Sequence, residues 1–266
     1  MRPFEGLASE TDWVALREVV PAATAPLRLK GSDREVVLST VLPLAWPAMV
    51  RSDGKVFLGL QVPTRSGDIS RDLGAALELA LAAEPGNPIQ LPGLPGPGPR
   101  LQDLLDDAPL DITVHEGFDY WIEGAPATET DEDDVAASME RANATVVPTV
   151  RLSGVEAAYW CRMKERAHVR WVLPENEDTV LNALARIAAS GGLAIGPDTR
   201  YVGAFRAHGL LVPVWDLPHD REAADLEQPV AELRTRLDSA LATAEPLSSD
   251  ERRARAGLMS RQLTLR

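Results

Sequence analysis

The amino-acid sequence predicts a mixed α/β protein of the α+β type, built from two halves of related design. Short strand-like runs end at Gly, Pro or Asp-Gly turn signals, and apolar residues spaced by three or four indicate helices between these runs. The order of segments also recurs along the chain. We expect each half to contain a helix, a strand, a hairpin, a second helix and a second strand, with a further helix near the C-terminus.

The first half covers residues 1–124, and a tight-turn signal is its strongest feature. Asp53-Gly54 predicts a hairpin, and Pro21 is expected to end the first helix. The loop 84–100 is so rich in proline and glycine that we expect neither strand pairing nor a helix there. The predicted elements are a helix at 12–20, a strand at 26–30, an apolar run at 35–45, a hairpin at 46–62, a helix from Asp68 or Ser70 to Ala83, and a strand region at 110–123.

An acidic connector, 125–134, leads into the second half, 135–245. Apolar side chains on one face predict the helix at 176–192, which Gly191 is expected to end. The predicted elements are a helix at 134–146, a strand at 149–154, a hairpin at 156–174, the helix at 176–192, a strand region at 209–218 and a last helix at about 226–243. The spacing of the predicted elements is the same in the two halves once two extra loops of the first half are left out. An alternative is that α/β proteins repeat this order without duplication.

Charge is distributed unevenly along the chain. The net charge is −13, with 40 acidic residues against 27 basic ones, which argues against nucleic acid and against an anionic membrane surface as partners. The tail, 246–266, carries five arginines against Asp250 and Glu251, a net of +3. Such a tail can fold back onto the acidic body or recruit a partner.

Several classes of function find no motif in this sequence. There is no phosphate-binding glycine loop and no nucleophile elbow, and we predict no cofactor. The single Cys161 excludes an intrachain disulfide and a multi-cysteine zinc site, and its apolar neighbours favour a packed core thiol over a reactive one. The four histidines lack metal-ligand spacing, so no metal site is predicted. No apolar run is long enough for a signal peptide or a membrane span, which predicts a cytoplasmic protein.

The candidate binding residues are basic and alternate along one predicted hairpin. In a single strand all would line one face, and a hairpin turning near Glu165 would still gather them at one end. They form a candidate site for a phosphate, a carboxylate or an acidic peptide. The alternative is that they neutralise the acidic surface. The residues are Arg162, Lys164, Arg166, His168 and Arg170.

Both ends of the chain carry a family resemblance. The stretches RPFEGLASETDWVALREVVPAATAPLRLKG, RAHGLLVPVWDLP and ERRARAGLMSRQLTLR resemble an uncharacterised actinobacterial family, classed as a domain of unknown function, over nearly the whole chain. The resemblance implies that members often carry a short zinc-binding SEC-C motif ahead of this region. That motif is missing here, through truncation or natural absence, because the chain starts at Met1 and its one cysteine is Cys161.

Our leading hypothesis is a non-catalytic cytoplasmic adaptor or protein-interaction domain. It rests on the acidic body, the Pro/Gly segment, the acidic connector and the basic tail, and either the tail or the Pro/Gly segment could contact a protein partner. The alternative is an enzyme or a small-anion-binding protein that uses a cleft between the two halves, with the basic hairpin at its mouth.

Overall fold

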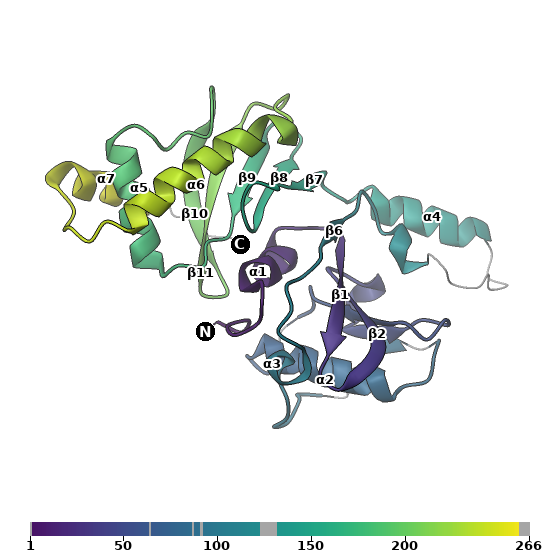
Figure 1. Cartoon of the computed structure of the whole chain (residues 1–266). Coiled ribbons are helices and arrows are strands. Elements are labelled where there is room, and N and C mark those ends of the chain that lie inside the picture. Colours follow the sequence, from purple (N-terminus) through teal and green to yellow (C-terminus); the bar gives the residue numbers. More distant parts are fainter. Residues whose placement is uncertain (1, 64, 87, 91–92, 123–131, 261–266) are drawn as a thin grey trace. The chain divides into compact units, whose positions relative to one another are not determined.

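The computed structural model describes residues 2–63, 65–86, 88–90, 93–122 and 132–260, and it confirms a mixed α/β fold. The chain divides into two compact units, an N-terminal unit over Pro3–Val146 and a C-terminal unit from Val147 onward, and each contains one sheet (Figure 1).

The N-terminal unit holds a mixed sheet with the order β5-β3-β4-β2-β1-β6 in the described residues. Strands β2 and β4 are parallel, and the other neighbouring strands are antiparallel. The elements are α1 (Glu10–Glu18), β1 (Ala23–Leu29), β2 (Ser32–Ser39), η1 (Pro43–Ala45), β3 (Ala48–Val50), β4 (Val56–Gly59), α2 (Ile69–Ala82), β5 (Pro88–Ile89), α3 (Leu101–Leu104), β6 (Thr113–Val114), η2 (Asp119–Trp121) and α4 (Glu132–Asn143).

The C-terminal unit holds an antiparallel sheet with the order β10-β11-β9-β8-β7 in the described residues. Helices α5 and α6 pack on one face of it, and their apolar side chains form one core with Trp160, Trp171 and Trp215. The elements are β7 (Thr149–Arg151), β8 (Ala158–Arg162), β9 (Ala167–Trp171), α5 (Glu177–Ala189), β10 (Arg200–Ala207), β11 (Leu210–Leu217), η3 (Ala223–Leu226), α6 (Glu227–Leu241) and α7 (Ser249–Met259).

Local signals predicted two of the hairpins, β3–β4 and β8–β9, and the longest helices. The turn between β3 and β4 contains Gly54 at φ 85°, a conformation that glycine adopts without steric cost. The Asp68 carboxylate accepts from the N–H of Ser70 at 3.1 Å and begins α2. Asn176 begins α5 in the same way, and Gly191 at φ 74° follows its last turn. These predictions are confirmed because each depends on interactions within a few residues.

Two predictions around the Pro/Gly loop were wrong. Residues Pro88–Ile89 do hold a short ladder against β3, because an edge strand needs hydrogen bonds on one side only and therefore tolerates proline. The expected strand region 110–123 contains only β6 and the 3-10 turn η2. There Phe118 and Trp121 stack with ring centroids 4.4 Å apart, so aromatic packing buries the apolar run that we expected in a strand.

The longest elements that the structure adds are strand β10 and helix α7, and the duplication stays unconfirmed. Strand β10 escaped prediction because Gly203 and a bulge between Tyr201 and Gly203 interrupt its alternation. Helix α7 lies in the predicted tail, and a capping box between Ser248 and Glu251 begins it. The two sheets differ in topology, since β2 and β4 are parallel whereas every neighbouring pair of the second sheet is antiparallel.

The unit boundary falls at Val146, so α4 is grouped with the N-terminal unit. Sequence had placed residues from 135 onward in the second half. Residues 125–131 of the acidic connector lie outside the described residues. The rest of the connector, 132–134, belongs to α4, which begins at Glu132. The Asn143 side chain explains the grouping, because its Oδ1 accepts from the N–H of Phe118 at 2.7 Å and its Nδ2 donates to Asp119 at 3.1 Å.

Candidate functional site

The predicted basic hairpin exists as β8 and β9, with its turn at the expected place. The N–H of Met163 donates to the carbonyl of Arg166 at 2.8 Å, which closes the turn around Glu165. Across the hairpin, Cys161 lies opposite His168 and Arg162 lies opposite Ala167. Because successive side chains of a strand alternate between its faces, this register decides which basic residues share a surface.

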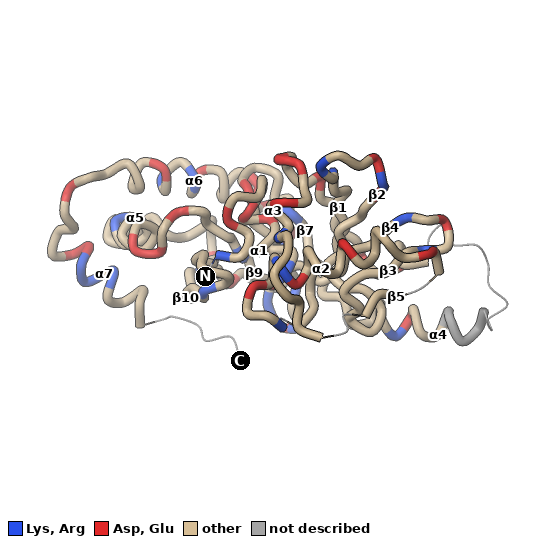
Figure 2. Tube along the Cα trace, turned by 90° about the horizontal axis from the view of Figure 1, so that it is seen from below, with Lys and Arg blue, Asp and Glu red and all other residues tan. Residues whose placement is uncertain are grey.

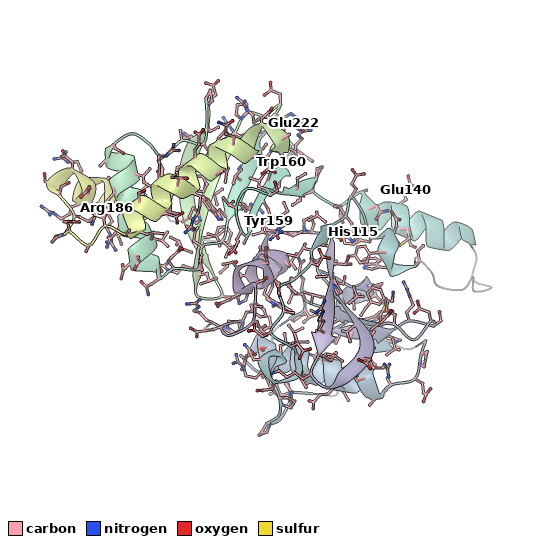
Figure 3. The ribbon with its side chains drawn as sticks, viewed as in Figure 1. His115, Glu140, Tyr159, Trp160, Arg186 and Glu222 are labelled. Atoms are coloured by element: carbon pink, nitrogen blue, oxygen red, sulfur yellow. The ribbon has the colours of Figure 1, made fainter. Side chains whose placement is uncertain are left out.

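Arg162 lies on the face that α5 and α6 cover. Its guanidinium stands 4.8 Å from the ring centroid of Trp160 and donates to Glu222 at 2.5 Å. Trp160 and Glu222 are labelled in Figure 3. The Trp160 indole donates in turn to the carbonyl of Arg221 at 3.0 Å. Lys164 lies exposed in the turn. Arg162 is therefore held by Trp160 and Glu222 on the helix-covered face, and it does not share a face with His168 and Arg170.

His168 and Arg170 lie on the opposite face, beside a carboxylate that sequence did not single out. Asp216 of β11 lies opposite His168 in the ladder, and its Oδ1 is 3.0 Å from Nδ1 of the imidazole. Its Oδ2 is 3.4 Å from Arg200 of β10 and 4.0 Å from Arg166 of the turn. We call Arg166, His168, Arg170, Arg200 and Asp216 the Asp216 cluster.

Arg170 is the cation of this cluster that the protein itself leaves unbalanced. It lies half-buried between Tyr159 and Val214 of the neighbouring strands. Among the described residues it has no ion-pair or hydrogen-bond partner. Two other guanidinium groups, those of Arg200 and Arg166, lie 3.4 and 4.0 Å from the carboxylate of Asp216, so the cluster holds three arginines and one carboxylate. Figure 2 shows the acidic and basic positions along the chain, where acidic residues prevail.

Cys161, His168 and Asp216 form a row across three adjacent strands, an order of nucleophile, imidazole and carboxylate used in some hydrolases. Their ionisation opposes such chemistry. Burial raises the pKa of the Cys161 thiol although Arg170 acts against it, and burial lowers the pKa of His168 although Asp216 acts against it. Thiol and imidazole are thus both neutral near pH 7, and the thiol is only 1% exposed. The row suits binding better than nucleophilic attack.

Acidification is expected to destabilise the protein through His168. Because burial lowers its pKa in the folded state, with Arg166 and Arg170 adding to the effect and Asp216 opposing it, the unfolded chain takes up the proton first. The stability it contributes is present above the unfolded value of about 6.5 and is lost as the pH falls through the folded value. Urea unfolding at about pH 7.5 and pH 5.5 should show a smaller loss for His168→Gln than for the wild type. An equal loss in this variant and in the exposed control His219→Gln would contradict the assignment.

The described part of the basic tail packs on α5. Leu258 is 5% exposed and belongs to the core of the C-terminal unit. Glu251 lies 3.4 Å from Arg186, and Arg255 lies 2.6 Å from Asp178. Residues 261–266, which include Leu263 and Leu265, lie outside the described part. Between 249 and 259 the tail is therefore an integral helix of its unit.

His115 belongs to the N-terminal unit, where it contacts the hydroxyl of Thr24 at 2.8 Å and packs on Tyr120. Within the described residues there is no group of three or more His, Cys, Asp or Glu side chains placed to hold a metal ion. The helices of the described part are also too short or too polar to cross a membrane.

Comparison with known proteins identifies the family. A model of DUF5926, a family of unknown function, matches residues 3–266. The chain belongs to this family. The match spans both units and the tail. No curated protein and no solved structure gives a significant match.

Two members of the Asp216 cluster were missed by the sequence argument. Arg200 and Asp216 are paired in the ladder of β10 and β11, far along the chain from the basic hairpin. Recognising β10 as a strand would have placed Arg200 opposite Asp216. Nothing in the sequence, however, indicates that β11 pairs with β9, since β11 follows β9 only after α5 and β10.

Proposed function

We propose that this protein is a non-catalytic, cytoplasmic interaction domain whose Asp216 cluster binds a carboxylate-rich segment of a protein partner. The supporting observation is Arg170, a half-buried arginine without an ion-pair or hydrogen-bond partner among the described residues, in a cluster with two other arginines. A charge in such a position is stabilised by an anion that forms paired hydrogen bonds with it. Carboxylate groups provide this geometry.

Exposure and charge around Arg170 support an incoming partner. The side chain of Arg166 is 57% exposed and that of Arg200 is 72% exposed, so both can turn toward a bound segment. The side chain of Asp216 is only 14% exposed and forms ion pairs with both arginines. On a protein of net charge −13, this local excess of positive charge would steer an acidic segment to one place and repel it elsewhere.

Calorimetric titration of the full chain with a peptide of about eight glutamates would test the proposal. We expect one binding site, and we expect affinity to fall about tenfold in Arg170→Gln and further in the double variant Arg166→Gln/Arg200→Gln. The matched control is Arg253→Gln on α7, which removes the same charge from a side chain that is 81% exposed. Its affinity should stay at the wild-type value.

Two outcomes would contradict the proposal. Equal affinity of the wild type and the cluster variants would show that the peptide does not bind at the Asp216 cluster. Full competition by citrate, together with no dependence on peptide length, would favour the alternative of a small-anion-binding protein with the same cluster. Unfolding curves of each variant distinguish loss of binding from loss of fold.

A further inference from the structure

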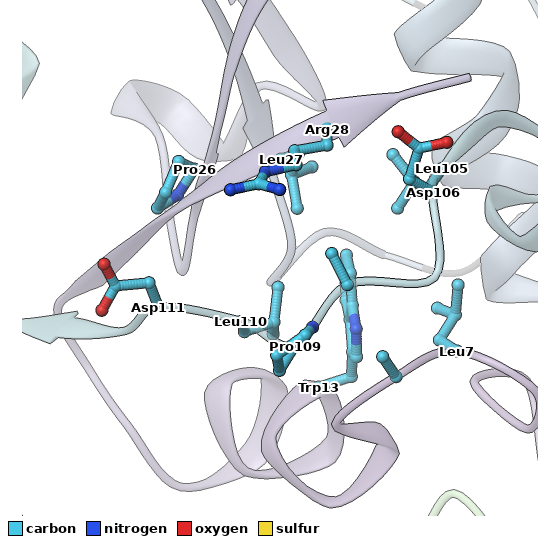
Figure 4. A pocket seen from close by; sticks show the side chains of 12 residues that line it. Leu7, Trp13, Pro26, Leu27, Arg28, Leu105, Asp106, Pro109, Leu110 and Asp111 are labelled. Carbon is cyan, nitrogen blue, oxygen red and sulfur yellow. The ribbon is translucent and has the colours of Figure 1, made fainter.

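A pocket in the N-terminal unit lies between β1 and the segment 105–111. These two segments are hydrogen-bonded at one end, where the N–H of Asp106 donates to the carbonyl of Arg28 at 2.9 Å. They meet again where β6 pairs with Ala23 and Thr24. Between these points the segment leaves the edge of β1, and a cavity of about 200 Å³ opens (Figure 4).

Large apolar side chains form the inner wall of this pocket. Trp13 of α1 is 2% exposed, and its ring is held against Phe4 with centroids 5.7 Å apart. Leu27, Leu105 and Leu110 complete the wall, each less than 10% exposed. Because these groups are nearly covered, the apolar surface that a ligand can reach comes mainly from Pro26 and Pro109, which line the same pocket and are exposed.

Three charged side chains surround the mouth of the same pocket. Arg28, Asp106 and Asp111 are all exposed, and Figure 4 shows the Arg28 guanidinium between the two carboxylates. None of the three side chains has an ion-pair or hydrogen-bond partner among the described residues. One cation and two anions thus share one pocket without pairing with one another.

We infer that this pocket binds a free α-amino acid with an apolar side chain, a role separate from that of the Asp216 cluster. The ligand carboxylate pairs with Arg28, whose planar guanidinium can form two parallel hydrogen bonds with it. The ligand ammonium pairs with Asp106 or Asp111, and its side chain lies against Pro26, Pro109 and Leu110. Drug-sized ligands occupy pockets of about 300–1,000 Å³, so the smaller volume here suits a single amino acid.

Calorimetric titration of the full chain with L-leucine tests this inference, with hexanoate and hexylamine as probes that carry one charge each. We expect L-leucine to bind at one site and each single-charge probe to bind at least about tenfold more weakly. Arg28→Gln should weaken L-leucine about tenfold or more, and Asp106→Asn/Asp111→Asn should do the same. The matched control, Arg34→Gln, removes an exposed cation outside the pocket and should leave affinity unchanged.

Three results would overturn the inference: no binding of L-leucine, hexanoate binding as tightly as L-leucine, or unchanged affinity in Arg28→Gln. The substituted positions are exposed, so the variants should unfold at the wild-type urea concentration. Filling the pocket by Ala108→Phe provides a second test that leaves the three charges in place, and it should abolish binding of L-leucine. The cluster variant Arg166→Gln/Arg200→Gln should still bind L-leucine, which separates this site from the proposed peptide site.

Discussion

Replacing Trp215 with alanine is expected to lower the free energy of unfolding by about 3 to 5 kcal/mol. Trp215 is 1% exposed, and its ring lies 6.4 Å from Trp171 and 5.6 Å from Tyr201. Its Nε1 donates to the carbonyl of Leu193 at 2.8 Å. The substitution therefore leaves a cavity between β11 and α5 and removes the partner of a carbonyl group. Urea unfolding followed by far-UV circular dichroism measures the loss.

A phenylalanine at the same position separates the two contributions. Trp215→Phe keeps most of the ring but cannot donate to Leu193, so its loss should be smaller than that of the alanine variant. The chain consists of two units, and the altered transition should be the one that reports the C-terminal unit. A loss below about 1 kcal/mol in the alanine variant would show that this core does not depend on Trp215.

Replacing Asp72 with alanine is expected to cost about 3 kcal/mol of folding stability. The side chain is on α2 and is only 2% exposed as a residue. Its carboxylate accepts from the N–H of Arg65 at 2.7 Å and from that of Ser66 at 3.1 Å. Burial lowers the pKa of Arg17, and the negative charge of Asp72 opposes that shift. The alanine variant therefore leaves the half-buried guanidinium of Arg17 with less compensating negative charge.

The matched control for this prediction is Asp33→Ala, since Asp33 is exposed in β2. It should change stability by less than about 0.5 kcal/mol. Asp72→Asn should fall between the two, because an amide oxygen can still accept one of the two hydrogen bonds. Equal urea midpoints for all three variants would mean that the segment 65–66 does not depend on Asp72.

Sequence reasoning worked where a few neighbouring residues decide the conformation. Asp53-Gly54 and Asp68 act through a turn and a cap within their own segments, and both behave as predicted. It failed where distant packing decides. The aromatic residues 118–121 form a stacked cluster and not a strand, and Pro88–Ile89 joins the sheet because β3 offers a free edge.

The candidate site divides in the same way. Alternating basic residues on a predicted hairpin correctly indicated that Arg166, His168 and Arg170 lie near one turn. Alternation alone did not show that Arg162 leaves them for the helix-covered face, where Trp160 and Glu222 hold it. The missing knowledge was the strand register, which depends on how the hairpin packs.

The sequence by itself determined the acidic character of the chain, the class of fold, two of the hairpins and the longest helices. These follow from composition, from hydrophobic periodicity and from hydrogen bonds between neighbours in the chain. Only the tertiary structure decided that Asp216 and Arg200 join His168 and that Arg28 shares a pocket with Asp111. Such meetings require strands and loops far apart in sequence to pair, and that pairing is selected by the burial of the whole core and not by any local pattern.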